Sequence, residues 1–112
     1  DYLAAKEMEV GRYYLQKGHH SSAINRFRIV VQDFQTTSQI PEALFRLVES
    51  YISLGLTAEA QLAGAVLARQ YASTDWNKQS INLLNGNGYV LDTASNNWLT
   101  KIYRQVIKGQ WL

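Results

Sequence analysis

Residues 10–27 read VGRYYLQKGHHSSAINRF, and the fold prediction starts from these residues. It opens on a run of helix formers in which Gly11 leaves room for a neighbouring helix. Gly18 follows, and glycine favours the left-handed turn that ends a helix. Ala23 and Phe27 then lie four residues apart, which places both on one helical face. The stretch therefore predicts two closely packed helices joined by a short turn.

Glycine and proline mark expected helix boundaries in the rest of the chain as well. It contains one proline, and its glycines fall mostly where an amphipathic pattern stops. Apolar residues recur at steps of three and four, which is the period of a helix and not of a strand. We expect caps at Ser21 or Ser22, at Thr57 and within residues 73–75. The expected helices cover about residues 2–17, 22–34, 41–54, 57–71, 76–84 and 95–108.

The composition describes an ordinary globular domain and excludes several classes. The 112 residues are 46% hydrophobic and 18% charged, enough for one core. A net charge of +2 is too small for a dedicated nucleic-acid binder. The chain has no cysteine, which removes disulfides, thiolate zinc sites and cysteine nucleophiles, and its apolar runs fall short of a membrane span. Residues 1–7 lack the layout of a secretory signal, so we expect a mature region or a piece of a longer protein.

A shift of 37 residues superimposes the two halves of the helical pattern. The matched pairs are Tyr14 with Tyr51, Gly18 with Gly55, Ala23 with Ala60, and Phe34 with Tyr71. These are the positions that the tetratricopeptide (TPR) repeat, usually 34 residues long, fixes for packing. Continuing the 37-residue period places Ile81 and Leu84 at the positions of Leu44 and Leu47 and indicates the first half of a third repeat.

The sequence therefore predicts an all-α TPR solenoid in one domain, 1–112. Two full helix hairpins make up repeat 1, about 2–36, and repeat 2, about 40–72. A truncated third hairpin and a C-terminal capping helix make up residues 75–112. In such an array each hairpin packs on the next, and the first helices line one face that is available to a partner.

Several of these segments closely resemble one TPR family. They are Lys6–Leu15, Gly18, Ala23–Phe27, Pro41–Leu44, Glu49–Tyr51, Gly55–Ala60 and Tyr71, together with the long connection Thr36–Pro41. The resemblance is to the C-terminal half of the BamD family, the TPR lipoproteins of the outer-membrane β-barrel assembly machine. The signal peptide, the lipidated cysteine and the first two or so repeats of that family do not occur in this sequence.

The resemblance implies a non-catalytic scaffold at the periplasmic face of the bacterial outer membrane. It implies docking to the POTRA domains of BamA and contacts with accessory Bam lipoproteins, and it leaves unfolded outer-membrane proteins as possible substrates. Membrane attachment would come only from an N-terminal lipid anchor outside this chain. In the family, the helix that carries Asn25-Arg26 is implicated in the BamA contact, which makes Arg26 the first candidate residue.

Four further residues are candidates for partner binding. Arg28 lies, like Arg26, off the apolar stripe of its helix, so each is either an interface residue or a solvated charge in a weak surface pair. Standard repeat geometry turns Arg12, Phe45 and Glu49 toward the groove, together with Met8, Leu15, Glu42 and Ile52. An exposed Phe45 would anchor a peptide, whereas a buried one belongs to the core.

The alternative function is a peptide-binding TPR adaptor or co-chaperone that clamps a linear motif in this groove. We expect no enzyme, because no nucleophile triad, phosphate loop or HExxH motif occurs. An accessory repeat of an enzyme whose catalytic residues lie elsewhere stays a second rival. We expect no cofactor, and no metal at His19-His20, because adjacent histidines at this helix–helix turn point apart and no carboxylate or third histidine lies nearby in the sequence. Lys101, Arg104 and Lys108 are read as the polar face of the cap more than as a lipid-binding surface.

Overall fold

The computed structural model describes residues 1–89, and these form α-helices only. The expected helix at 95–108, with its basic face, lies outside the described residues. None of the described helices is long and apolar enough to cross a membrane. The described helices are α1 (Tyr2–Gln16), α2 (His20–Asp33), α3 (Ile40–Ser53), α4 (Thr57–Gln70) and α5 (Asp75–Gly86).

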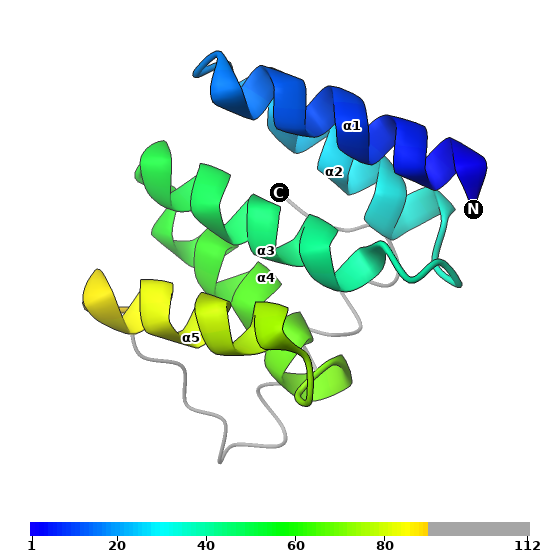
Figure 1. Cartoon of the computed structure of the whole chain (residues 1–112). Coiled ribbons are helices and arrows are strands. Elements are labelled where there is room, and N and C mark those ends of the chain that lie inside the picture. The colour runs from blue at the N-terminus through cyan, green and yellow to red at the C-terminus, as the bar shows by residue number, and fades with distance from the viewer. Residues whose placement is uncertain (90–112) are drawn as a thin grey trace.

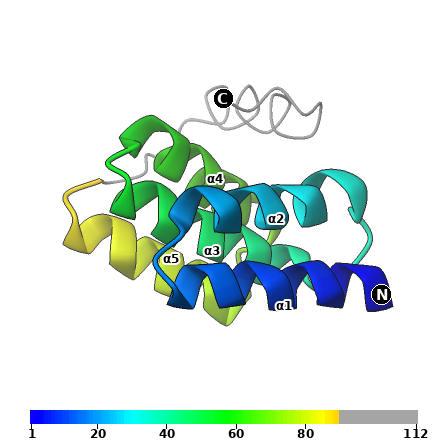
Figure 2. The same ribbon diagram turned by 90° about the horizontal axis from the view of Figure 1, so that it is seen from above.

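The helices form stacked antiparallel hairpins, as a TPR solenoid requires (Figure 1). The first hairpin is α1 with α2, and the second is α3 with α4. The hairpins meet where α3 packs on α2, and α5 then packs on both α3 and α4. The first helices α1, α3 and α5 share one side of the molecule, while α2 and α4 lie behind them (Figure 2). The predicted all-α repeat fold is confirmed.

The turn after each first helix has the same backbone geometry. Gly18, Gly55 and Gly88 adopt φ angles of 77°, 74° and 80°, which side chains other than glycine rarely adopt. The residue after each glycine donates its backbone N–H to a carbonyl five residues earlier, over 2.8 to 2.9 Å. This is the Schellman arrangement, which satisfies the last carbonyls of a helix. The predicted glycine stops at residues 18 and 55 are therefore confirmed.

These turns also fix the register of α5, and they correct the 37-residue extrapolation. The N–H of Tyr89 donates to the carbonyl of Leu84, as the N–H of Leu56 donates to that of Tyr51. Leu84 is thus equivalent to Tyr51, and the predicted match of Leu84 with Leu47 is wrong. Gly88 follows Gly55 by 33 residues because both the preceding connection and α5 are shorter than their counterparts.

The helix caps differ in part from the prediction. The Thr74 hydroxyl accepts the N–H of Asn77 at 3.2 Å, so one of the three candidates before α5 is a true N-cap. The expected caps at Ser21 or Ser22 and at Thr57 are wrong. Ser21 and Ser22 already lie inside α2, and Thr57 is the first residue of α4, so the turn residues before them hold the cap positions without side-chain bonds.

The core runs continuously through both full hairpins. Phe27 is fully buried, and its ring lies against Gly11, where an added Cβ would come within 2.5 Å of the ring. Such close approach is what the small residues of the sequence pattern predict. Leu44, Leu47 and Leu67 are likewise fully buried and continue the core through α3 and α4. Leu84 adds α5 to the same cluster, so the hairpins form one rigid array.

Candidate interaction surface

A series of ion pairs connects α1 with α3 on the side of the molecule that the first helices form. Arg12 of α1 donates from Nη1 to both carboxylate oxygens of Glu42 of α3 at 3.1 Å. Arg46, one turn after Glu42, donates from Nε to the same carboxylate at 3.2 Å and from Nη1 to Glu49 at 2.9 Å. We call Arg12, Glu42, Arg46 and Glu49 the ion-pair ladder. It ties α1 to α3 through side chains that are only partly exposed.

Arg46 is the centre of this ladder and extends it to α5. Its guanidinium carbon lies 5.6 Å from the ring centroid of Phe45 and 5.5 Å from that of Trp76, which is cation–π distance. The two rings are themselves 5.6 Å apart. Burial disfavours the charge of Arg46, but the hydrogen bonds and charges of Glu49 and Glu42 outweigh this effect and raise its pKa. Arg46 is therefore charged at any physiological pH and fixed in position.

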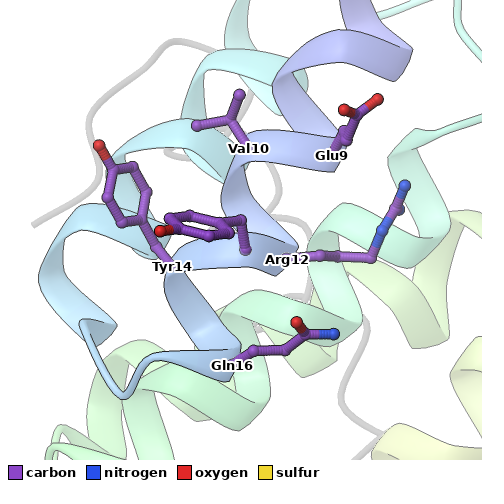
Figure 3. Close-up of a pocket in the computed structure, with 6 residues that line it drawn as sticks. Glu9, Val10, Arg12, Tyr14 and Gln16 are labelled. Atoms are coloured by element: carbon purple, nitrogen blue, oxygen red, sulfur yellow. The ribbon is translucent and has the colours of Figure 1, made fainter.

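Two hollows adjoin the ladder on α1. One of about 580 Å³ is lined by residues of α1 that include Val10, Arg12 and Tyr14 (Figure 3), together with the exposed Tyr13. The other, of about 250 Å³, lies between α1 and α3 and is lined by Arg12, Leu15, Gln16 and Arg46. Arg12 and Gln16 extend to the same side of α1, away from Val10 and Tyr14. Two of the four residues that line the smaller hollow are therefore arginines.

Arg26 lies apart from the ladder, within the first hairpin. Its Nη1 donates to both carboxylate oxygens of Glu7 on α1, at 3.3 and 3.1 Å. The Arg26 side chain remains 39% exposed, so it can still reach a partner. A pair this exposed contributes about 0–1 kcal/mol to stability. The ion pair with Glu7 therefore adds little stability, but it positions the Arg26 guanidinium.

Arg28 occupies a third location, on the other side of the array. It lines a cleft of about 330 Å³ where α2 meets the loop between α3 and α4. Leu54 and Leu56, on either side of the helix-ending glycine, are each about 40% exposed at this cleft. Tyr51 is buried there, and this burial raises its pKa, while Arg28 lowers it and Glu59 raises it further.

The five candidate residues therefore do not form one site. Arg12 and Glu49 share the ladder, while Arg26 and Arg28 lie elsewhere on α2. Phe45 is only 6% exposed and packs on Trp76, so of the two alternatives for this residue the structure supports the core and not the exposed peptide anchor. Met8, placed in the same groove by repeat geometry, is fully buried. Packing of α5 on α3 covers Phe45, whereas Met8 belongs to the core cluster.

Sequence reasoning missed Arg46, the most connected residue of this surface. The signal was present, because Glu42, Arg46 and Glu49 follow one another at the four- and three-residue spacings of helical ion pairs. Within residues 1–89, the side chains that could bind a metal do not gather into a cluster of three or more.

Comparison with known proteins gives the family. The sequence model of the YfiO outer membrane lipoprotein family matches residues 1–67. The outer membrane protein assembly factor BamD of Caulobacter vibrioides is 50% identical over 88 residues, which are 79% of this chain and 29% of that protein. BamD of Rickettsia prowazekii is 46% identical over 84 residues, which are 75% and 34% of the two chains.

A more distant relative is BamD of Neisseria meningitidis serogroup B, 30% identical over 79 residues, which are 70% of this chain and 30% of that protein. No solved structure gives a significant match. The chain thus spans about a third of the length of the curated relatives it matches. On these grounds, the chain belongs to the YfiO/BamD family of outer membrane lipoproteins.

Proposed function

We propose that this chain is a non-catalytic scaffold of the outer-membrane β-barrel assembly complex and that it docks to the POTRA region of BamA. The similarity to proteins named outer membrane protein assembly factor BamD carries this proposal. The chain would act at the periplasmic face of the outer membrane and would also contact accessory Bam lipoproteins. Unfolded outer-membrane proteins are a possible further partner.

The geometry supports a role in docking. Stacked hairpins with a continuous core present their surface side chains in fixed positions, so a partner need not order a loop on binding. Arg26 is held by Glu7 yet remains 39% exposed, which suits an arginine that exchanges or shares a carboxylate with a partner. We therefore keep Arg26 as the first residue of the BamA contact, and Arg28, on a different face of α2, as a second candidate.

The peptide-adaptor alternative receives less support. Its proposed anchor, Phe45, is buried and therefore cannot hold a side chain of a linear motif. A clamp for a linear motif needs exposed side chains along the groove. The scaffold is therefore the function that the fold and the family support best.

The test is a pull-down of this chain by purified POTRA domains of BamA. Arg26→Glu should abolish most of the binding, because it places a like charge where the partner offers a carboxylate. Arg69→Glu, an exposed charge change in the last turn of α4, is the matched control and should bind as the wild type does. Absence of binding by the wild type would reject the partner.

A charge exchange separates direct contact from support of the hairpin. Glu7→Arg combined with Arg26→Glu can restore the internal pair while it leaves the reversed charge on α2. If Arg26 contacts BamA, the double variant stays defective although its thermal stability recovers. Recovery of binding in the double variant would instead show that only the internal pair matters, and Arg26 would leave the proposed interface.

A further inference from the structure

The hollow between α1 and α3 is a site with two arginines at its rim. Arg12 and Arg46 line it together with Leu15 and Gln16, and its volume of about 250 Å³ admits a small group rather than a helix. The two arginines come from consecutive hairpins, so the site exists only in the stacked array. It lies on a different face of the molecule from Arg28, and it is separate from the pair of Arg26 with Glu7.

Both guanidinium groups have N–H donors that the ion-pair ladder does not use. Arg12 bonds Glu42 through Nη1 alone, and Arg46 uses Nε and Nη1 for Glu42 and Glu49. Among the contacts within residues 1–89, Nε and Nη2 of Arg12 and Nη2 of Arg46 donate to no protein acceptor. A guanidinium has five N–H donors in a planar fork, and that fork matches the two oxygens of a carboxylate.

The surroundings hold these donors in place before any ligand arrives. Glu42 is shared by both arginines, and the Arg46 guanidinium lies on the rings of Phe45 and Trp76. Side chains that are already ordered lose little rotamer entropy on binding. Because Glu42 and Glu49 balance the two arginine charges, attraction of a ligand depends on directed N–H donors more than on net charge.

We propose that this hollow binds a carboxylate of a partner polypeptide, which would accept hydrogen bonds from Arg12 and Arg46 together. The carboxylate can belong to an acidic side chain or to a chain terminus, because both present the same two oxygens. Leu15 gives an apolar contact to the carbon atoms that carry the carboxylate, and the Gln16 amide offers a further polar contact at the rim. The site does not depend on the BamA docking proposed above.

The experiment titrates the ¹⁵N-labelled chain with three short acetylated peptides and follows the arginine Nε–H signals by NMR. One peptide is amidated and contains Glu, the second is identical except for Gln in place of Glu, and the third carries the Gln sequence with a free C-terminus. We expect the signals of Arg12 and Arg46 to shift with one or both carboxylate peptides and to stay fixed with the Gln amide. Equal shifts with all three peptides, or no shift with either carboxylate peptide, overturn the proposal.

Substitutions test the residues. Arg12→Gln and Arg46→Gln should each weaken binding about tenfold, since each removes charge-assisted hydrogen bonds. Arg12→Lys keeps the charge but loses the fork, and it should also bind more weakly than the wild type. Arg69→Gln, on the exposed end of α4, is the control and should change nothing. Arg12 is 39% exposed, so its variants remain folded even if Arg46→Gln does not, and unchanged binding by Arg12→Gln overturns the assignment.

Discussion

Replacement of Gly11 by alanine tests the close packing of the first hairpin. An added Cβ would lie 2.5 Å from Cε1 of Phe27 and 2.8 Å from Cζ, whereas ordinary contact begins at 3.4 Å. The ring must therefore move by about 1 Å, and Phe27 is fully buried among core side chains. Overpacking of this kind costs about 1–3 kcal/mol.

The higher helix propensity of alanine offsets part of this destabilisation. Alanine is favoured over glycine inside a helix by about 1 kcal/mol, so the net destabilisation expected for Gly11→Ala is about 0–2 kcal/mol, with a central value of about 1 kcal/mol. For a domain of about this size, a loss of about 1 kcal/mol lowers Tm by about 4–8 °C. The measurement is thermal and urea unfolding of the two proteins, followed by far-UV circular dichroism.

Gly86→Ala is the matched control. Gly86 ends α5, and nothing lies within 4 Å of the Cβ that alanine would add, so this variant should be neutral or more stable by up to about 1 kcal/mol. Phe27→Leu combined with Gly11→Ala should cost less than the sum of the two single changes, because a smaller side chain relieves the clash. A Gly11→Ala protein at least as stable as the wild type would refute the packing argument.

Two further predictions concern the second and third hairpins. Thr74→Ala removes the N-cap bond to Asn77 and should cost about 1 kcal/mol in urea unfolding, whereas Ser73→Ala next to it should cost less than about 0.5 kcal/mol; equal losses would contradict the cap assignment. Burial raises the pKa of Tyr51, so the native state retains the Tyr51 hydroxyl proton to a higher pH than the unfolded chain, which releases it at about pH 10. The stability this provides is complete below about pH 10 and is lost as the pH rises through the native pKa, and Tyr51→Phe should therefore reduce the alkaline loss of stability. Tyr13→Phe, on an exposed ring, is the control, and an identical alkaline slope in both variants would contradict this origin.

The sequence predicts the helices and their order well because the apolar period and the glycine stops act locally. The caps were predicted less well. After Gly18 the backbone enters α2 at once, so Ser21 and Ser22 come too late to cap it. The register of α5 was missed because Asn77 and Ser80 occupy buried positions where the second repeat has Leu44 and Leu47.

The interaction surface was less accessible from the sequence. Whether Phe45 is buried depends on how closely α5 packs on α3, and the sequence of neither helix alone determines that distance. Arg46 carries a helical ion-pair spacing, but its place above two rings depends on Trp76, 30 residues later in the chain. Arg26 was identified from the resemblance, and its bond to Glu7 emerges only from the angle between α1 and α2.

The contrast between the constant glycine turns and the unequal connections has an evolutionary consequence. Six residues, Phe34–Gln39, join the first hairpin to α3, and four, Tyr71–Thr74, join the second to α5. Insertions and deletions can accumulate in these connections without changing how a hairpin closes. Gene duplication could thus copy a hairpin as an intact unit, while drift in the spacers erodes the period by which the copies are recognised.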